Sequence, residues 1–428
     1  MDAPIPLSLD YAKQLDQADP ISAYREQFHL PVQASGDPYV YLCGNSLGCQ
    51  PKETQAFLQT ELEDWAHLGV EGHLHGRNPW LPYHEFLSPA LSRIVGAKET
   101  EVVAMNGLTV NLHLMMVSFY RPTPERYKIL VEADAFPSDL YAVSSQAAFH
   151  GYDADQAIVK LHPREGEHCL RTEDILAVLE AQGSEIALVL IGGVNYYTGQ
   201  LFDIATLTAA AQAQGCIVGW DLAHAAGNVL LNLHEWGVDF ACWCSYKYLN
   251  AGPGAVAGCF VHERHHEAEA IPRLAGWWGH DKASRFEMGP DFQAIPTVEG
   301  WQLSNAPILS MAALRASLNI FEEVGMEALR KKSVALSGYL RHLLLHKPGP
   351  LKFDIITPEA EEERGCQLSL LTEEGGRDAF DALCREGVIC DWREPNVIRL
   401  APAPIYNSFE DAWHFADRLT SWQPSDSQ

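Results

Sequence analysis

The sequence predicts an α/β fold with a mostly parallel sheet, and three observations support this prediction. Short apolar runs alternate with helical segments from about residue 98 to residue 261. The run IALVLIGGV at 186–194 is continuously apolar, which is typical of a strand buried on both faces. Reactive residues directly follow two other runs: Asp221 follows 216–220, and Lys247 follows 240–244. Such side chains at the carboxyl ends of neighbouring strands would share one edge of the sheet.

The same pattern assigns the elements along the chain. A helix is expected over 9–26. Strands are expected at 101–105, 128–132, 157–161, 186–194, 216–220, 240–244 and 255–261. A helix opens at residue 107, and further helices are expected over 138–148, 172–182 and 205–214. Thr172 is a good N-cap for the third of these, and Gly215 ends the fourth.

The chain is predicted to divide into an N-terminal arm (1–50), a large domain (51–320) and a small C-terminal domain (321–428) that packs with the arm. Its length of 428 residues agrees with more than one domain. A long apolar stripe over 322–346 follows the second boundary. The pieces at 367–371, 378–385, 388–391 and 397–401 then predict a small α+β unit.

Composition excludes several function classes. The formal net charge of −26 argues against a nucleic-acid partner, which needs clustered Lys and Arg. No apolar window is long enough for a membrane span, and the N-terminus lacks the pattern of a signal peptide. The ten cysteines include no C-x-x-C pair, and several lie inside apolar runs. We therefore expect buried thiols, no metal site and a cytoplasmic location.

Three short motifs suggest other functions and fit their contexts poorly. Ser46 lies in a G-x-S-x-G pattern, but Pro51 follows where the helix of a serine hydrolase should run. The H-E-x-x-H pattern from His262 to His266 follows a strand instead of lying in a helix, so a polar loop is favoured over zinc. Gly252-Pro-Gly254 precedes a strand, unlike a dinucleotide-binding loop.

Asp221 and Lys247 suit a pyridinium cofactor, with the lysine as a Schiff base and the carboxylate on the ring nitrogen. Each could instead be ordinary: a helix cap and a snorkelling surface lysine. Phe136 can stack on a ring, and Leu108-Thr109 and Ser138-Asp139 lie at expected helix starts, which are natural phosphate sites. This chain order is typical of fold-type I pyridoxal-phosphate enzymes.

Over nearly its whole length the chain resembles the kynureninase family. The matching segments include GNSLG, RNPW, LTVNLH, AFPSD, YYTGQ, DLAHAAGN, DFACWCSYKYLNAGPG, GWWGH and LSNAPI. The resemblance implies the fold-type I architecture: a mostly parallel seven-stranded sheet flanked by helices, and a smaller C-terminal α+β domain. It also implies pyridoxal 5'-phosphate as cofactor and a homodimer with shared active sites, in which GWWGH and LSNAPI reach a neighbouring subunit's cofactor.

The resemblance implies a role for each matching residue. Lys247 carries the cofactor, Asp221 pairs with its ring nitrogen, and Tyr246 is a candidate proton shuttle. The cofactor-binding residues would be Leu108, Thr109, Phe136, Pro137, Ser138, Asp139, Asp221, His224, Tyr246, Lys247, Trp277 and Asn305. The substrate-binding residues would be Arg399 for the α-carboxylate, and His73, Ser46 and Asn305 around the aromatic ring. Gly192 departs from the Ser or Thr of relatives, so only a backbone contact or none can remain there.

The implied reaction is hydrolysis of the Cβ–Cγ bond of L-kynurenine or 3-hydroxy-L-kynurenine. It yields an anthranilate and L-alanine in tryptophan catabolism, and 3-hydroxyanthranilate can feed NAD biosynthesis. A polar set of His73, Ser46 and Asn305 favours the 3-hydroxy substrate. The alternatives are a cysteine desulfurase or aminotransferase-like enzyme, a serine hydrolase using Ser46, and an inactive scaffold. Cys366 precedes a strand-like run and does not suit the mobile cysteine of a desulfurase.

Overall fold

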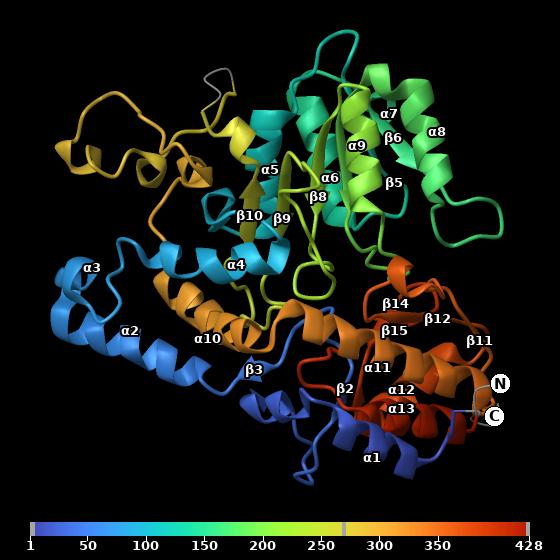
Figure 1. The fold of residues 1–428 in the computed structure, drawn as a ribbon. Coiled ribbons are helices and arrows are strands. Elements are labelled where there is room, and N and C mark those ends of the chain that lie inside the picture. The colour runs from blue at the N-terminus through green and yellow to red at the C-terminus, as the bar shows by residue number, and fades with distance from the viewer. Residues whose placement is uncertain (1–4, 268–270, 425–428) are drawn as a thin grey trace.

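A seven-stranded sheet forms the centre of the larger part of the molecule in the computed structural model, which describes residues 5–267 and 271–424. The strands lie in the order β4-β10-β9-β8-β7-β5-β6 (Figure 1). Their bounds are β4 Val102–Ala104, β5 Lys128–Glu132, β6 Ile158–Leu161, β7 Ile186–Gly192, β8 Ile217–Asp221, β9 Phe240–Trp243 and β10 Gly258–Val261. From β9 to β6 all pairs are parallel, whereas β10 is antiparallel to both β4 and β9. The predicted mostly parallel α/β sheet is confirmed.

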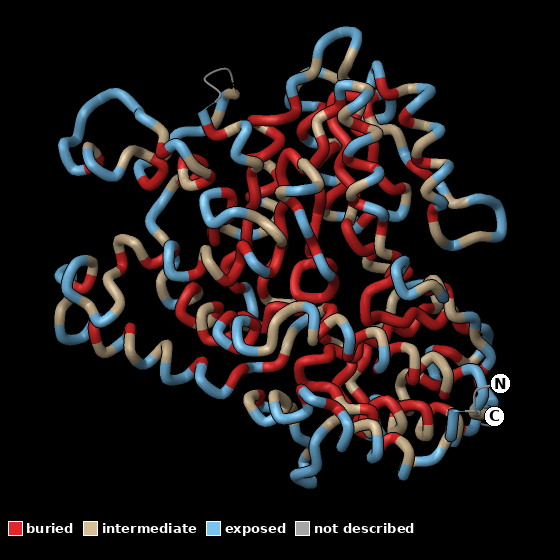
Figure 2. The backbone as a smooth tube through the Cα atoms, in the orientation of Figure 1, coloured by how far each residue is buried: buried red, intermediate tan, exposed pale blue. Residues whose placement is uncertain are grey.

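Helices cover both faces of this sheet, because successive side chains of a strand point to opposite faces. On one face, Ile129 and Val131 pack with apolar residues of α5 (Leu108–Phe119) and α6 (Pro137–Phe149). On the other, Leu130 belongs to a core with α4 (Ser88–Val95), α8 (Thr172–Gln182), α9 (Ile204–Ala213) and α10 (Ile308–Val324). The strands are therefore buried between two layers, as Figure 2 shows.

A second sheet with its own apolar core lies in the C-terminal part. Its order is β11-β12-β15-β14, all antiparallel, with bounds β11 Phe353–Ile355, β12 Leu368–Thr372, β14 Asp391–Arg393 and β15 Val397–Leu400. Its core includes residues of α11 (Met326–His346), α12 (Gly376–Arg385) and α13 (Phe409–Ser421). Ala12, Val40 and Leu42 from the N-terminal segment belong to the same core. The division at residues 50 and 320 stays a prediction.

The N-terminal segment connects the two parts. Its α1 (Leu9–Ala18) lies beside α13, and β2 (Val40–Tyr41) pairs in parallel with β13 (Val388–Ile389) (Figure 1). The strand β1 (Phe28–His29) pairs with β3 (Gln50–Pro51). The remaining helices are α2 (Thr54–Leu68), α3 (Gly72–His75) and α7 (Ala154–Ala157). None of the helices in the described residues is long and apolar enough to cross a membrane.

Three predicted elements need correction. The helix expected over 9–26 ends at Ala18, because Asp19 is extended before Pro20, and a 3-10 turn over Ser22–Gln27 follows. The apolar stripe over 322–346 spans a break at Gly325, where a φ of 77° separates α10 from α11. The strand expected over 255–261 begins only at Gly258, after a turn in which the Ser310 hydroxyl accepts the Val256 N–H.

Candidate active site

A cavity of about 450 Å³ opens where β5, β7 and β8 end. Parallel pairing puts their carboxyl ends at one edge, and Gly192 lies directly opposite Asp221 in the register of β7 and β8. The lining residues are Asn45, Ser46, Gly107–Val110, Glu132, Ala135, Phe136, Ser138, Asp139, Gly192, Val194–Tyr196, Asp221, Ala223, His224, Tyr246, Lys247, Arg393 and Arg399. The fold therefore brings most of the predicted site residues into one place.

Lys247 lies at the cavity with its amine against a histidine. Its Nζ is 2.8 Å from Nε2 of His224, and both residues line the cavity. Burial, and then the charge of Lys247, hold the pKa of His224 well below its ordinary value. His224 is therefore neutral near pH 7, and its Nε2 accepts a hydrogen bond from Nζ of Lys247. Its buried Nδ1 has no hydrogen-bond partner among the residues that the structure describes.

Asp221 ends β8 and keeps part of its carboxylate available. Its Oδ1 accepts the N–H of Ala223 at 2.8 Å, as a cap of the following turn would. Asp139, on α6, is its acidic neighbour. Burial and the charge of Asp221 raise the pKa of Asp139 well above its ordinary value, and Lys247 opposes that rise. Two buried acids beside one lysine form a site suited to a cationic ring.

Two helix N-termini meet at another wall of the cavity. The helix α5 begins at Leu108 after Gly107, which provides no side-chain cap, and α6 begins at Pro137. The hydroxyls of Thr109 and Ser138 are 3.0 Å apart and join these two ends. First-turn N–H groups and hydroxyls at two positive helix ends suit a phosphate group. Pro137 has no N–H to donate, and it does not line the cavity.

Phe136 and Tyr246 add aromatic rings to the site. Phe136 is 45% exposed, and its ring lies 5.3 Å from that of Tyr196. Tyr246 lines the cavity next to Lys247, and burial raises the pKa of its phenol. The phenol therefore keeps its proton near neutral pH and can donate it.

Arg399 comes from the small sheet and is almost fully buried. One of its NH groups donates to the Tyr196 carbonyl at 2.6 Å, and another contacts Asp391. Its Nε has no hydrogen-bond partner in the described part of the chain. Arg393 on neighbouring β14 also lines the cavity and bonds to Asp391 at 3.1 Å. Two guanidinium groups at one cavity suit a carboxylate.

Ser46 lines this cavity, whereas three other predicted residues do not. The Nδ1–H of His73 donates to the Val70 carbonyl, and its ring packs on Trp80. Trp277 is 42% exposed, and its Nε1 donates to the Arg285 carbonyl. Asn305 is exposed. A single chain therefore does not bring His73, Trp277 and Asn305 to Lys247, and their roles stay predictions.

Sequence reasoning missed Glu132, Asn195, Tyr196 and Arg393, all of which line the cavity. Glu132 looked like the polar end of the strand KILVE, although it is only 4% exposed. Its position directly after three apolar strand residues, 129–131, was the available signal. The sequence around Arg393 gave no such signal, because only the pairing of β14 with β15 brings this residue beside Arg399.

The competing motifs do not form sites of their own. Gly48 is followed by β3 instead of a helix, and among the described residues no hydrogen bond joins Ser46 to a histidine. The stretch after β10 forms a 3-10 turn at Glu263–His265, and His266 bonds back to the Val261 carbonyl. Cys366 is fully buried, and burial raises the pKa of its thiol to about 12, which does not suit a desulfurase nucleophile.

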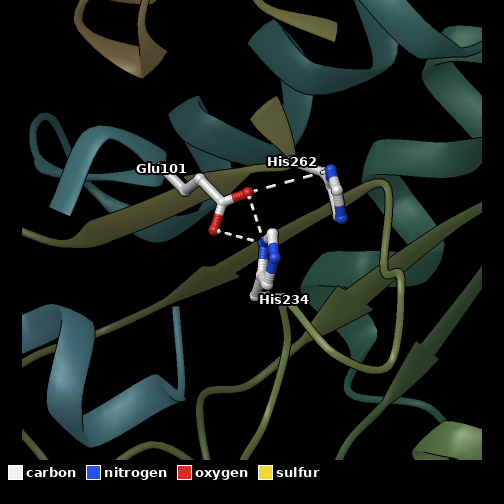
Figure 3. A group of neighbouring side chains, drawn as sticks. All are labelled: Glu101, His234 and His262. Atoms are coloured by element: carbon white, nitrogen blue, oxygen red, sulfur yellow. Dashed lines mark hydrogen bonds and ion pairs between the residues drawn. The ribbon is translucent and has the colours of Figure 1, made fainter. Parts of the chain in front are cut away.

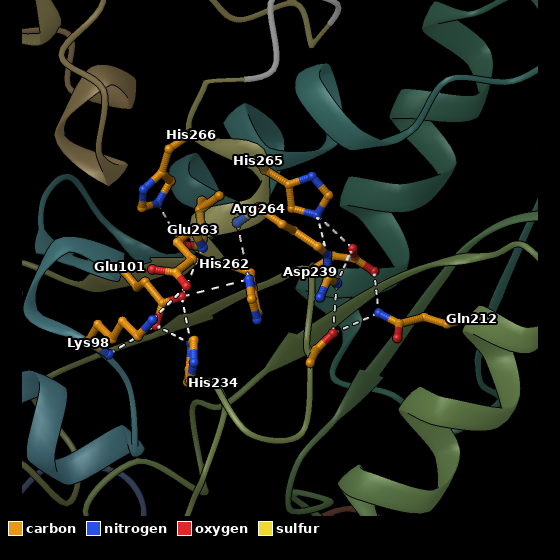
Figure 4. A network of polar contacts seen from close by, with 12 residues as sticks. Lys98, Glu101, Gln212, His234, Asp239, His262, Glu263, Arg264, His265 and His266 are labelled. Atoms are coloured by element: carbon orange, nitrogen blue, oxygen red, sulfur yellow. Dashed lines mark hydrogen bonds and ion pairs between the residues drawn. The ribbon is translucent and has the colours of Figure 1, made fainter.

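A second polar cluster surrounds Glu101, which is fully buried at the other end of the sheet. Its carboxylate lies 2.9 Å from Nδ1 of His234 and 3.7 Å from Nδ1 of His262 (Figure 3). It also accepts the N–H groups of Lys98 and Glu263, in a wider network that reaches Asp239 (Figure 4). These hydrogen bonds satisfy the buried carboxylate, so the cluster acts as a structural clamp.

Solved structures of other proteins share this fold. A cysteine desulfurase from Thermococcus onnurineus NA1 aligns with a TM-score of 0.72 at 17% identity, covering 89% of this chain and 93% of that one. A complex of the cystine C-S lyase C-DES with cysteine persulfide gives 0.77 at 17% identity, covering 90% and 98%. The chain thus has the fold of the fold-type I enzymes.

Sequence relatives place it more narrowly. Kynureninase from Myxococcus xanthus is 58% identical, with 96% of each chain covered. Kynureninase from Homo sapiens is 50% identical over 96% of this chain and 92% of the relative. A model described as the kynureninase C-terminal domain matches residues 329–419. The chain belongs to the kynureninase family.

Proposed function

We propose that this chain is a pyridoxal-phosphate hydrolase that cleaves the Cβ–Cγ bond of L-kynurenine or its 3-hydroxy form. The products are an anthranilate and L-alanine, as a step of tryptophan catabolism, and the 3-hydroxy product would feed NAD biosynthesis. One observation carries the proposal: Lys247, Asp221 and Arg399 line the same cavity in a chain of this family. A lysine, an acid and an arginine match an aldehyde cofactor, its ring nitrogen and an amino-acid carboxylate.

The residues of the cavity fit this cofactor. Lys247 would hold it covalently, Asp221 its ring nitrogen, and Thr109 and Ser138 its phosphate. Among the described residues, no side chain caps the N-termini of α5 and α6, so their first-turn N–H groups would be available to the phosphate. When bound, the cofactor supplies an electron sink for carbanion chemistry at the substrate.

Lys247, together with His224, would take the proton from the α-carbon of the substrate. With substrate in the cavity, Lys247 Nζ would be the base that takes this proton. Neutral His224, 2.8 Å away, accepts a hydrogen bond from Nζ and adds no positive charge. His224 therefore orients the amine of Lys247 at the cavity, and it leaves that amine able to take up a proton.

Arg399 and Tyr246 act on the substrate itself. Arg399 is held by the Tyr196 carbonyl and Asp391, so its guanidinium is fixed before the substrate arrives. Tyr246 keeps its phenolic proton because burial raises its pKa. We infer that it donates this proton to Cβ after the Cβ–Cγ bond breaks. Before that cleavage, water adds to the γ-carbonyl and gives its proton to a general base, so that Cγ leaves as the carboxylate of the anthranilate.

We further propose that the working form is a cytoplasmic homodimer with shared sites. His73, Trp277 and Asn305 lie away from the cavity of their own chain, so a second copy would have to supply them. Large apolar side chains are exposed beside the cavity: Leu47, Val110, Phe136 and Tyr141. A second copy covering them would explain that exposure. Buried free thiols, such as Cys242 and Cys259, suit a reducing compartment.

The cofactor proposal is tested by absorbance. The purified protein loaded with pyridoxal phosphate should show a band near the visible edge that borohydride reduces, and Lys247→Ala should abolish it. Ser46→Ala should keep the band. A colourless wild-type protein that retains esterase activity would contradict the proposal and favour Ser46.

The substrate preference is tested separately. We expect a higher kcat/KM for 3-hydroxykynurenine, because a polar pocket can reward the extra hydroxyl with a hydrogen bond. Side-by-side steady-state assays on the same preparation measure it. Equal or reversed values would reject this preference while leaving the cleavage reaction intact.

A further inference from the structure

Glu132 is a buried acid at the cavity that the proposed reaction does not use. It ends β5, is 4% exposed, and lines the cavity beside the turn that follows β7. Its Oε2 accepts the Gly192 N–H at 2.7 Å, and its Oε1 accepts the Asn195 Nδ2 at 2.7 Å. Both carboxylate oxygens therefore hold the same short segment, residues 192–196.

This segment connects the two halves of the site. On one side, the Gly193 N–H donates to the Asp221 carbonyl at 2.7 Å, next to the acid proposed for the ring nitrogen. On the other side, the Tyr196 carbonyl accepts from Arg399 at 2.6 Å. A shift of segment 192–196 would therefore move Asp221 and Arg399 together.

Gly192 leaves the space that Glu132 occupies. A Cβ built at Gly192 would lie 3.1 Å from Oε2 of Glu132, a contact that forces the carboxylate aside. The Gly192 N–H is already bound to that carboxylate. Within the chain, the backbone contact expected at Gly192 is therefore made with Glu132.

Keeping a charged carboxylate at position 132 is unfavourable in free energy. Burial raises the pKa of Glu132 to about 7, and the charges of Asp221 and Asp134 add to the rise. Asp139, Lys247, Arg393 and Arg399 are further titratable groups at this cavity, and Glu132 in turn raises the pKa of Asp139. A neutral side chain would avoid this repulsion, so the two accepted hydrogen bonds are the evident reason for an acid at this position.

We propose that Glu132 is a positioning residue that holds segment 192–196, and through it Asp221 and Arg399, in the geometry needed for cofactor and substrate. The inference rests on the proposed function, because it concerns the same site. Glu132 would act through its two hydrogen bonds to segment 192–196.

A pair of variants separates the hydrogen bonds from the charge. In Glu132→Gln, the new NH₂ would face either the Asn195 NH₂ or the Gly192 N–H, so one of the two hydrogen bonds would be lost. Asn195 cannot turn over, because its Oδ1 already accepts from the N–H groups of Tyr197 and Thr198 and from the Thr198 hydroxyl. The double variant Glu132→Gln/Asn195→Asp restores a donor opposite an acceptor, keeps Oδ1 as it was, and moves the charge to position 195.

The measurements are the dissociation constant for pyridoxal phosphate, kcat and KM for kynurenine, and the pH profile of the visible band. We expect Glu132→Gln to weaken cofactor binding and to raise KM, each by roughly tenfold, as for a lost buried hydrogen bond. The double variant should return both to within about threefold of wild type. The pH profile of the visible band in the double variant should still differ from that of wild type, because the charge then lies at position 195. Glu101→Gln, a fully buried glutamate in the clamp away from the cavity, is the control and should change neither constant.

Two results would overturn the inference. If Glu132→Gln binds cofactor and substrate like wild type, Glu132 positions nothing. If the double variant is as impaired as the single one, the charge at position 132 matters and the hydrogen bonds do not. Wild-type protein that fails to bind pyridoxal phosphate would instead reject the proposed function itself, and this inference with it.

Discussion

At the scale of single residues, the site depends on groups whose protonation is set by burial. His224 is kept neutral, Tyr246 keeps its proton, and Glu132 and Asp139 are pushed toward their protonated forms. All four shifts have desolvation as their largest cause. A positively charged ring placed among these acids would reverse part of that effect, so cofactor binding should be coupled to proton release from the acids.

Glu132 makes a pH dependence of stability measurable in the cofactor-free protein. Its pKa is about 7 when folded, against 4.5 for an ordinary glutamate. Below pH 4.5 both states carry the proton, and between 4.5 and 7 only the folded state keeps it. The contribution of Glu132 to stability is therefore lost as the pH rises through about 7, by roughly 3 kcal/mol at most.

Glu132→Gln cannot titrate and lacks this loss. The Tm of the variant minus that of wild type, both free of cofactor, should therefore rise from pH 5 to pH 7 and level off above it. Differential scanning calorimetry in buffers of equal ionic strength measures the difference. A difference that stays constant over this range would show that the carboxyl is charged throughout.

At the scale of elements, the ends of α5 and α6 were predictable and their meeting was not. Gly107 before LTVNLH and Pro137 after Phe136 are local helix-start signals, and the structure begins both helices there. That Thr109 comes within 3.0 Å of Ser138 depends on how both helices pack on one face of the sheet. The positions of Glu132 and Arg393 at the cavity were likewise not predictable, because the order of the strands in the sheets brings them there and their neighbours in the sequence do not.

The paired helix ends predict how the phosphate is held. Thr109→Val keeps the shape of the side chain and removes the hydroxyl, so it should weaken pyridoxal-phosphate binding by roughly five- to tenfold. Binding of phosphate-free pyridoxal should be little changed, because the lost contact is to the phosphate alone. Equilibrium dialysis of both compounds measures this. Equal weakening for the two ligands would place Thr109 at the ring instead.

At the scale of the whole molecule, the sequence order Thr109, Phe136, Asp221, Lys247 and Arg399 predicted a single site, and the fold assembles these residues around one cavity. The order also included His73, Trp277 and Asn305, which the single chain leaves outside. A linear pattern records that residues serve one function, but it does not record which copy of the chain contributes them. The homodimer proposed above resolves this difference and makes a quantitative prediction.

Subunit exchange tests the shared sites directly. Lys247→Ala removes the lysine from one chain, and the double variant Trp277→Ala/Asn305→Ala removes the residues proposed to cross the interface. Each should be inactive or nearly so alone. In a hybrid dimer, the intact Lys247 of one chain meets the intact Trp277 and Asn305 of the other, so one of the two sites is complete. Since random exchange makes about half of all dimers hybrids, roughly a quarter of wild-type activity should return.

The control is a mixture of Lys247→Ala with Asp221→Asn, two changes within the same chain's cavity. In that hybrid each site carries one of the two defects, so no wild-type site forms and the activity should stay near that of the separate variants. Native mass spectrometry establishes that hybrids are present. Hybrids without recovered activity would mean that Trp277 and Asn305 serve their own chain, which would then have to bring the segments around 277 and 305 over its own cavity.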